Sequence, residues 1–476
     1  MESDRKGRER AASVKAAMQH AWKGYEDYAW GADELAPSSK RGKESWGNMG
    51  VTLVDSLDTL WLMGMKDEFW GGGPAVRRYL DIFKGEAGKK CGGIFGQAFA
   101  AKGLWDIRGC PLVKRNTMEG DDGASHCEKI LCLKTVLKPC GVKDPPGGSN
   151  RTQGANSGEK RKEATRKKAG KSTVEFRYLS EITGDRKYAD KANKVFELMS
   201  EIHPANGVPP FFQPLPLENR SAAVRVTFGA LGDSFYEYLL KAWLQGGMKE
   251  TSYRSMYDRA MDGMTHLLLK KSNPSGLTYV SDWNGHSNVA KMDHLVCFLA
   301  GTLALGAQTT EDSDRAERDM KTAKALAYTC YQMYARQKTG LAPEMVLFED
   351  EKDMVVPPKT AYNILRPETA EALFVLHQIT GDPIYREWSW EIFQAFEKHC
   401  RLPVAFGSFP NVNDPRAHPE DRMESFFLAE TLKYLYLIQD PDHKVDLSEY
   451  VFNTEAHPLR VFSGMRQDRE EAGAMA

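Results

Sequence analysis

"FRYLSEITGDRKYADKANKVFELM" at residues 176–199 and "LFVLHQITGDPIYREWSWEIFQAF" at residues 373–396 follow one pattern. Both contain Ile-Thr-Gly-Asp and a tyrosine three residues beyond the aspartate. In each, a run with helical apolar periodicity stops at glycine, and a second amphipathic run begins after a short polar turn. Glycine suits a helix end because it adopts the left-handed conformation without a Cβ clash. Each segment therefore predicts a hairpin of two α-helices.

Looser copies of this scheme occur elsewhere in the chain, with helix-ending glycines expected at Gly64, Gly247 and Gly306. From Gly184 onward the copies lie about 60–75 residues apart, which is enough for two helices and their connections. Helical hairpins in series bury their apolar faces against one another and form a solenoid or a closed toroid. The hydrophobic fraction of 41% permits a core of that size. We predict an all-α fold built as a toroid of helical hairpins.

Residues 71–172 do not continue the repeat. They contain GGGP, CGGIF, PPGGSN and a run of Lys and Arg, a composition that buries little apolar surface. We interpret the segment as a gene model in which an intron was read through and an exon was lost; a genuine disordered insertion is the alternative. We divide the chain into a charged N-terminal tail (1–14), the first part of a catalytic barrel (15–70), the aberrant or disordered segment (71–172), the rest of the barrel (173–462) and a C-terminal tail (463–476).

The bulk properties exclude several classes of protein. A net charge of −1 argues against a nucleic-acid partner for the chain as a whole. The N-terminus MESDRKGRERAA lacks the apolar core of a signal peptide, and no run is as long as a membrane span, so neither a signal peptide nor a membrane anchor is visible. HExxH, P-loop, GxSxG and post-strand GxGxxG motifs are missing from the sequence.

Acidic residues gather where helices are expected to begin. In "GDSFYEYLL", Ser234 and Glu237 have the spacing of a capping box, with Asp233 just outside it. In "RPETAEALF", a proline precedes Glu368 and Glu371, which share one helix face. In "DRMESFF", Asp421 and Glu424 have the spacing of a helix N-cap residue and the third helical residue. Other acidic sites are Glu344 in "APE" and Thr454 with Glu455 in the short turn "FNTEAHP".

A single acidic helix start has a structural explanation, because the helix dipole stabilises negative charge there. In a toroid, however, the inner helices can present the same end to one cavity, so that several such starts form one acidic pocket. Paired carboxylates suit glycoside hydrolysis, in which one protonates the leaving oxygen and the other activates water. They equally suit a hard cation such as Ca²⁺. His294 in "KMDHLVCFLAG" is either a substrate contact or a structural histidine, the commoner case for a lone His at a helix start.

At these residues the sequence resembles the class I α-1,2-mannosidases, glycoside hydrolase family 47, over about residues 15–70 and 172–462. The resemblance implies an (α/α)7 barrel, here with one hairpin disrupted or replaced by an irregular basic segment. It also implies calcium-dependent, inverting removal of terminal α-1,2-linked mannose from high-mannose N-glycans on glycoproteins. The expected compartment is the secretory pathway, ER or Golgi, and the expected state is a monomer. The matching stretches are "AWKGYEDYAWGADELAP" (21–37), "GVTLVDSLDTLWLMG" (50–64), "GDSFYEYLLKAWL" (232–244), "MDHLVCFLAG" (292–301), "LRPETAEALF" (365–374), "MESFFLAETLKYLYL" (423–437) and "VFNTEAHPL" (451–459).

The resemblance also implies residue roles. Glu368 is similar to the general base, Asp233 to the catalytic aspartate on the acid side, and Glu344 to a further catalytic carboxylate. Thr454 resembles the residue that binds Ca²⁺ through its carbonyl and hydroxyl oxygens. The implied substrate-binding residues are His294, Arg366, Glu371, Glu424 and Glu455, and the implied disulfide joins Cys297 to Cys330, which requires an oxidising compartment.

One family motif is not found. The family places a proton-donor Glu in a Phe-Glu-x-x-Ile-Arg segment followed by Gly-Gly-Leu, and nothing between Phe69 and Val174 matches it. Two alternatives therefore stay open beside the mannosidase. One is a catalytically impaired, lectin-like glycan-binding relative that keeps the calcium and mannose site. The other is a helical scaffold whose basic segment binds a partner.

Overall fold

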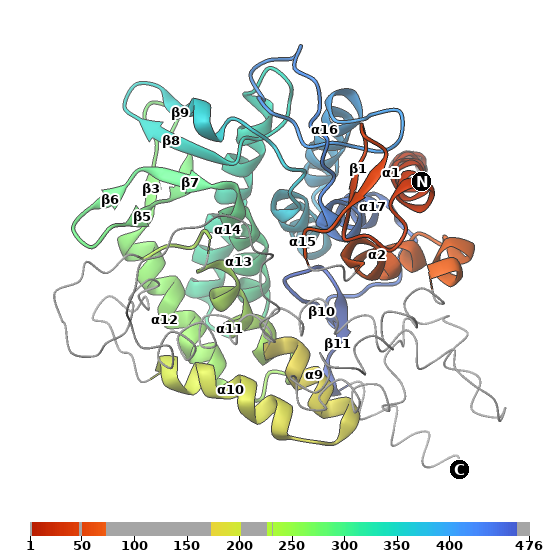
Figure 1. The fold of residues 1–476 in the computed structure, drawn as a ribbon. Helices are drawn as coiled ribbons and strands as arrows, with labels where there is room; N and C mark the ends of the chain where they lie inside the picture. Colours follow the sequence, from red (N-terminus) through yellow and green to blue (C-terminus); the bar gives the residue numbers. More distant parts are fainter. Residues whose placement is uncertain (1, 47–49, 73–172, 201–225, 231, 464–476) are drawn as a thin grey trace, which may run out of the picture.

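The computed structural model describes residues 2–46, 50–72, 173–200, 226–230 and 232–463 (Figure 1). Apart from Gly71 and Gly72, the segment 71–172 and its disrupted hairpin lie outside these ranges, as does the expected C-terminal tail beyond residue 463. The α-helices are α1 (Glu2–Tyr28), α2 (Val51–Leu62), α9 (Thr173–Thr183), α10 (Lys187–Ser200), α11 (Asp233–Gln245), α12 (Thr251–Leu267), α13 (Phe298–Gln308), α14 (Ser313–Ala335), α15 (Glu368–Thr380), α16 (Ile384–His399) and α17 (Leu432–Gln439).

The helical hairpins predicted from the repeat are confirmed. Helices α9 and α10, α11 and α12, α13 and α14, and α15 and α16 pack pairwise. Gly184, Gly247 and Gly381 end the first helix of three pairs with positive φ values of 71°, 72° and 68°. The expected helix end at Gly306 is wrong, because α13 continues to Gln308. A Cβ at Gly306 would lie 2.3 Å from Tyr257 Oη, so this glycine permits the close approach of α12.

The first helices of the pairs form an inner ring. In the described part of the chain, α9 contacts α11, α11 contacts α13, α13 contacts α15, and α15 contacts α17. Helix α17 continues the π-helix η6 (Phe427–Thr431), which packs on α2. Helices α11, α13, α15 and α17 are buried almost throughout, whereas α10, α12, α14 and α16 are amphipathic and cover them on the outside (Figure 1). The all-α toroid of hairpins predicted from the sequence is confirmed.

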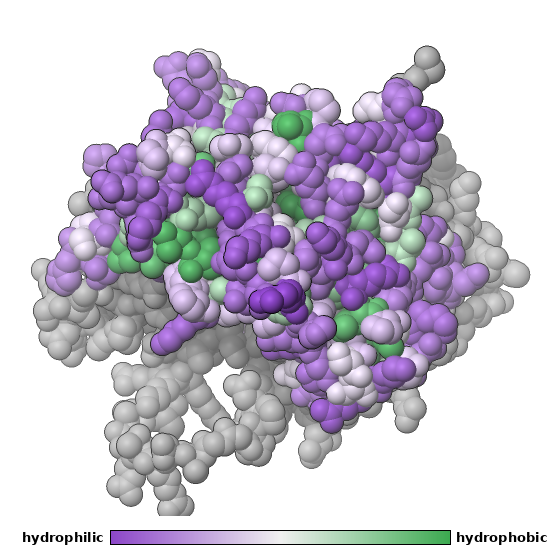
Figure 2. All heavy atoms as spheres, turned by 90° about the horizontal axis from the view of Figure 1, so that it is seen from above, coloured by the Kyte–Doolittle hydropathy of each residue, from purple (hydrophilic) through white to green (hydrophobic). Residues whose placement is uncertain are grey.

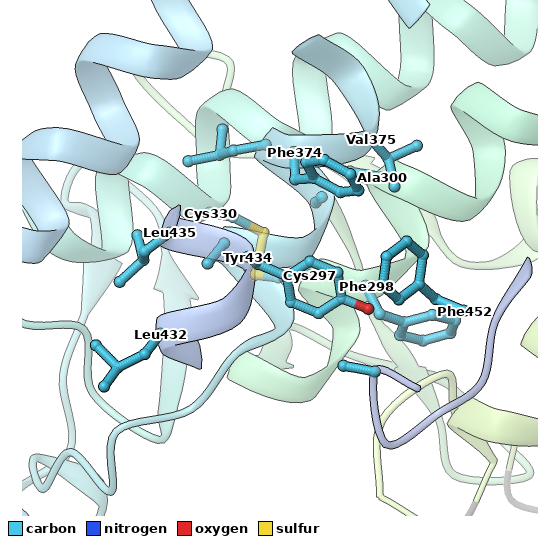
Figure 3. Packing of buried hydrophobic residues seen from close by; sticks show 14 of the residues in the cluster. Cys297, Phe298, Ala300, Cys330, Phe374, Val375, Leu432, Tyr434, Leu435 and Phe452 are labelled. Atoms are coloured by element: carbon cyan, nitrogen blue, oxygen red, sulfur yellow. A yellow bond between two sulfur atoms is a disulfide. The ribbon is translucent and has the colours of Figure 1, made fainter. Parts of the chain in front are cut away.

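A short β-hairpin enters this ring. Strands β10 (Tyr450–Phe452) and β11 (Pro458–Arg460) pair antiparallel, and β10 packs on α11. The Phe452 ring lies 5.7 Å from Phe374 of α15 and 5.4 Å from Tyr434 of α17 (Figure 3). The strand side chains are buried because they fill the space that the inner helices leave.

The other strands are short, antiparallel and belong to connections between helices. They pair as β1 with β2, β3 with β4, β5 with β6, and β7–β8–β9 as one sheet. Seen from above, hydrophilic residues predominate on the surface and hydrophobic residues form separate patches (Figure 2). The bounds are β1 (Glu34–Ala36), β2 (Arg41–Lys43), β3 (Leu269–Lys271), β4 (Thr278–Val280), β5 (Asp282–Trp283), β6 (Asn288–Val289), β7 (Lys291–Asp293), β8 (Met345–Glu349) and β9 (Asp353–Val355).

Residues 2–14, predicted to be a charged tail, form the first half of α1. Val14 is fully buried, and the charges of this half-helix pair with the neighbouring α16. Lys6 Nζ lies 3.0 Å and Arg10 Nη2 2.6 Å from the Glu387 carboxylate. The segment is helical because its charges are matched by another helix, which the sequence alone does not show.

The disulfide implied by the resemblance is present. Cys297, at the end of the 3₁₀-helix η4 (His294–Cys297), is bonded to Cys330 of α14, with the two Cα atoms 5.9 Å apart (Figure 3). Cys400, the remaining cysteine within the described ranges, is buried with a free thiol. None of the helices in those ranges is long and apolar enough to cross a bilayer.

Candidate active site

The acidic starts of α11 and α15 are joined by one buried lysine. Lys241 Nζ, on a side chain only 3% exposed, forms an ion pair with Glu237 and lies 3.2 Å from Glu371 Oε1. Glu237 follows Asp233 by about one helical turn, and Glu371 follows Glu368 by about one turn. The two acidic helix starts that we expected to meet therefore do lie together.

Glu368 is the first residue of α15, and 14% of its side chain is exposed. Its Oε2 lies 3.1 Å from His294 Nδ1, and its Oε1 lies 3.8 Å from Arg366 Nη1. Burial raises the pKa of Glu368, but the hydrogen bond with His294 and the charge of Arg366 outweigh burial and hold it below its ordinary value. Glu368 is thus an ionised carboxylate, as a general base requires.

His294 stands behind Glu368. It is buried at 1% exposure, and its Nε2 lies 2.9 Å from the Tyr334 hydroxyl and 3.1 Å from Thr369 Oγ1. Both ring nitrogens are therefore engaged within the protein. Of the two alternatives for His294, a substrate contact or a structural histidine, this arrangement favours the structural one. The His294 ring orients the Glu368 carboxylate.

Arg366 and Glu344 form a two-point ion pair beside Glu368. Arg366 Nε lies 2.7 Å and 2.8 Å from the two Glu344 oxygens, and the side chains are 19% and 17% exposed. Glu344 does not begin a helix, as its acidic motif suggested, because it directly precedes strand β8. Its N–H donates to the carbonyls of Thr360 and Tyr362, and its own carbonyl accepts from His294 N, so the backbone fixes it instead.

Glu371 has the opposite electrostatic environment to Glu368. Burial raises the pKa of Glu371 to about 7, since the charges of Glu237 and Glu368 add to burial and Lys241 offsets it only in part. The two carboxyls of α15 therefore differ in how readily they lose a proton. Glu371 is therefore only partly ionised near neutral pH, whereas Glu368 is ionised.

Glu371→Gln is expected to make the free energy of unfolding less dependent on pH. A carboxyl group whose pKa is higher in the folded state binds more protons when folded, so the wild type loses stability as pH rises from 4.5 to about 7. Between pH 5 and pH 8, we expect the free energy of unfolding of the variant to rise by roughly 2 kcal/mol relative to that of the wild type. Urea unfolding at both pH values measures this, with Glu397→Gln on the outer helix α16 as the matched control. A difference between Glu371→Gln and wild type that is the same at both pH values would contradict it.

The turn between β10 and β11 brings Thr454 to the start of α11. Thr454 N donates to the Tyr238 hydroxyl (3.1 Å), and Thr454 Oγ1 lies 3.4 Å from Ser234 Oγ, next to Asp233. Asn453 Oδ1 accepts hydrogen bonds from the backbone of Glu455 (3.1 Å), which shapes the turn. Asp233, Thr454 and Glu455, predicted from distant motifs, are thus neighbours.

Glu175 beneath this turn was not predicted. Its Oε1 accepts from the Tyr238 hydroxyl (2.5 Å) and Asn453 Nδ2 (2.8 Å), while its buried Oε2 meets no partner within the described ranges. Burial raises the pKa of Glu175 to about 7, and the charge of Glu455 contributes. The sequence does carry a sign of this residue, because Glu175 interrupts the apolar face of α9.

A second unpredicted group supports the turn from below. Lys433 Nζ, fully buried, donates to Asp58 Oδ2 (2.7 Å) and to the carbonyl of Ala456 (2.7 Å). His457 Nδ1 lies 3.0 Å from the same Asp58 oxygen. Ala456 has a φ of 59°, a left-handed conformation that is costly for alanine and needs such support. From the sequence, this group could have been suspected because a lysine, Lys433, lies within the apolar run "LKYLYL".

Glu430 is a further acidic residue near Glu237 and Glu371, and the sequence analysis did not predict it. It lies in the π-helix η6, a distortion often found at functional sites. Burial raises the pKa of the Tyr434 hydroxyl, and the charges of Glu371, Glu430 and Glu237 raise it further. The carboxylates of α11, α15 and η6 thus all act on one buried tyrosine.

Glu424 precedes η6 and is paired with an arginine. Its carboxylate is bound by Arg422 Nε (2.8 Å), and burial together with the charge of Glu34 raises its pKa to about 7. The expectation that Asp421 caps a helix here is wrong. Its side chain accepts instead from the backbone N–H groups of Ser38 (2.8 Å) and Ser39 (3.0 Å), so it stabilises the β1–β2 turn.

The atoms around Thr454 decide whether a cation could bind there. Within the described ranges, no group of three or more His, Cys, Asp or Glu side chains is placed to hold a metal ion. The donors near Thr454 are oxygens of hydroxyl, carbonyl and carboxylate groups, including the buried and unpartnered Glu175 Oε2. Hard cations such as Ca²⁺ prefer these donors and accept water among their ligands. These oxygen donors match the ligand chemistry that a hydrated Ca²⁺ takes.

The chain is similar to known proteins over most of its length. The profile of Glycosyl hydrolase family 47 matches residues 17–88 and 145–461, so the stretch that does not match is 89–144, narrower than the 71–172 expected from the sequence. A mannosyl-oligosaccharide 1,2-alpha-mannosidase of Arabidopsis thaliana is 39% identical over 456 residues, covering 95% of this chain and 79% of the relative. An endoplasmic reticulum mannosyl-oligosaccharide 1,2-alpha-mannosidase of Rattus norvegicus is 40% identical over 471 residues, covering 96% and 68%.

The fold is shared with a solved structure as well. An alpha-1,2-mannosidase from Trichoderma reesei superposes with a TM-score of 0.73 at 25% identity, covering 95% of this chain and 99% of that chain. The motifs, the ring of helical hairpins and the clustered carboxylates agree with this match. The chain belongs to glycosyl hydrolase family 47.

Proposed function

We propose that the chain is a mannosyl-oligosaccharide 1,2-α-mannosidase that removes terminal α-1,2-linked mannose from high-mannose N-glycans, with inversion and dependence on Ca²⁺. The observation that carries the proposal is Glu368, an ionised carboxylate fixed between His294 and Arg366 in a pocket of further carboxylates. Relatives named as 1,2-alpha-mannosidases cover most of the chain at 39–40% identity, which supports the same substrate class.

The proposed chemistry uses these residues as follows. Glu368 accepts a proton from a water molecule, whose oxygen then attacks the anomeric carbon from the face opposite the leaving group. The bond from the anomeric carbon to the glycosidic oxygen breaks, and that oxygen takes a proton from the acid side of the pocket, to which we assign Asp233. A single displacement of this kind inverts the anomeric configuration. Arg366, held by Glu344, orients the sugar and keeps Glu368 ionised.

Calcium has a defined place in this proposal. Thr454 would hold it through its hydroxyl and carbonyl oxygens, and Glu455 would act through water. Bound there, the cation would supply positive charge that orients sugar hydroxyls. Ser234 and Tyr238 contact Thr454 from α11, so a cation held by Thr454 would lie near the acidic helix start.

Thr454→Ala is expected to weaken calcium retention by at least about tenfold, since the loss of one charge-bound oxygen ligand costs about 1.5–3 kcal/mol. Calorimetric titration of the chelated protein with Ca²⁺ measures this, and Thr380→Ala at the outer end of α15 is the matched control. An unchanged affinity for Ca²⁺ would remove Thr454 from the site.

Mannose release from a high-mannose glycan, with and without chelator, tests the proposal as a whole. Release that is lost with chelator and restored by Ca²⁺ is the expected result. Glycan binding without release favours the alternative, a glycan-binding relative without turnover. We also propose the secretory pathway as the compartment, because the Cys297–Cys330 disulfide requires oxidising conditions, and a monomer as the working state.

A further inference from the structure

Tyr334 of the outer helix α14 contacts a histidine of the proposed active site. Its hydroxyl lies 2.9 Å from His294 Nε2, and the centroids of the two rings are 5.7 Å apart. The Tyr334 ring also packs edge-on against Phe396 of α16. Both Tyr334 and His294 are buried, so their polar atoms must find partners within the protein. An outer helix thus supplies a hydroxyl group to the histidine that contacts Glu368.

The Cys297–Cys330 disulfide joins the two elements that carry this contact. His294 begins η4 and Cys297 ends it, whereas Tyr334 follows Cys330 by about one turn of α14. The short helix η4 also packs on both α14 and α15. The imidazole and the phenol are therefore held by segments that a covalent bond joins about one turn away.

The directions of the hydrogen bonds around His294 follow from its partners. An ionised carboxylate only accepts hydrogen bonds, so His294 Nδ1 donates to Glu368 Oε2 across 3.1 Å. In a neutral imidazole, the second nitrogen then carries a lone pair and needs a donor. The hydroxyls of Tyr334 and Thr369 lie 2.9 Å and 3.1 Å from Nε2, and both are placed to donate to it. These contacts favour the tautomer that directs its N–H toward Glu368.

The Tyr334 hydroxyl keeps the proton that this bond requires. Burial raises the pKa of Tyr334, and the negative charge of Glu368 raises it further. Thr369, which follows Glu368 directly on α15, also forms a hydrogen bond with the Tyr334 oxygen. The two hydroxyls and His294 Nε2 are therefore one connected group on the side of the ring opposite Glu368.

We propose that Tyr334 is a positioning residue for the reaction: together with Thr369 it donates to His294 Nε2, which keeps Nδ1–H directed at Glu368 Oε2. The inference rests on the proposed role of Glu368 as the base. Arg366 faces the other carboxylate oxygen, Oε1, at 3.8 Å, so two separate groups fix the two oxygens. Tyr334 acts through the imidazole and not on the sugar, because it bonds to the nitrogen that faces away from Glu368.

Tyr334→Phe is expected to lower kcat for mannose release about fivefold, and Thr369→Val by a similar factor, because each removes one neutral hydrogen bond. KM should stay within a factor of about two, since neither hydroxyl contacts the sugar. Tyr331→Phe, which removes a hydroxyl bound to Glu391 on the outside of the ring of helices, and Thr380→Val at the end of α15 are the matched controls. Thermal unfolding of each variant verifies that it is folded. An unchanged kcat in both Tyr334→Phe and Thr369→Val would overturn the proposal.

A double-mutant cycle with Glu368→Gln separates positioning from packing. If Tyr334 acts only through the base, Tyr334→Phe should lower single-turnover release about fivefold in the wild type and less than about twofold in Glu368→Gln. A general effect on the fold would reduce release equally in both backgrounds. Equal losses would therefore overturn the proposal.

NMR of ¹⁵N-labelled histidine tests the arrangement without turnover, at neutral pH in calcium-containing buffer. The His294 signals are assigned by their absence from His294→Gln. In the wild type, Nδ1 should be protonated and Nε2 should not, and Tyr334→Phe should move the Nε2 signal downfield because Nε2 loses a donor. A protonated Nε2, or an Nε2 signal that Tyr334→Phe leaves in place, would overturn the proposal. A wild type with the expected signals but without mannose release would contradict the proposed function and leave the arrangement around Glu368 confirmed.

Discussion

Glu368→Gln is expected to reduce mannose release by at least about 10³-fold while leaving glycan affinity within a factor of about two. Glutamine keeps the size and the hydrogen-bonding oxygen of the side chain, so contacts with His294 and Arg366 can persist. It cannot accept a proton from water at neutral pH, which removes the base. Single-turnover release and equilibrium binding, measured on the same preparation, separate the two effects.

Glu397→Gln is the control for this substitution. Glu397 lies on the outer helix α16 and pairs with Arg401 (2.9 Å), far from the inner ring. Its replacement removes the same charge and should change neither release nor affinity. Normal turnover by Glu368→Gln would reject Glu368 as the base, and a parallel loss of affinity and turnover would make it a binding residue instead.

Lys433→Met is expected to lower the free energy of unfolding by about 3–5 kcal/mol, the cost of leaving a buried charge without its partner. Lys433 and Asp58 are 0% and 1% exposed, so water cannot replace the lost ammonium group. The Ala456 carbonyl also loses its donor, and the turn that holds Thr454 loses support. We therefore expect weaker Ca²⁺ retention together with the loss of stability, measured by urea unfolding and by calcium titration.

The double variant Asp58→Asn with Lys433→Met tests the cause. Asparagine removes the unpaired charge, so part of the lost stability should return, whereas the calcium affinity should stay low because Ala456 remains unsupported. Lys324→Met on the exposed face of α14 is the control and should stay within about 0.5 kcal/mol of the wild type. Full recovery of calcium affinity in the double variant would show that Lys433 does not position the turn.

The helical hairpins were predictable because helix formation depends on residues that are close together in the sequence. Apolar residues recur with the helical period, and glycines mark helix ends such as Gly184 and Gly381, where φ is positive. The acidic starts of α11 and α15 were visible for the same reason. Gly306 does not mark a helix end, because its role is to let Tyr257 of another helix pack closely. Such a contact between distant helices cannot be read from the local sequence.

The sequence by itself determined the class of fold, the order of the hairpins and most of the acidic residues of the pocket, because those properties depend on neighbours within a few turns. Only the tertiary structure decided that Lys241 joins Glu237 to Glu371, which lies 130 residues beyond the lysine. It also decided that His294 supports Glu368 and that Lys433 holds the turn of Thr454. The physical reason is that the state of a charge depends on the groups within a few ångströms of it. Those groups come from distant helices, whose placement is fixed only when the ring closes and buries them together.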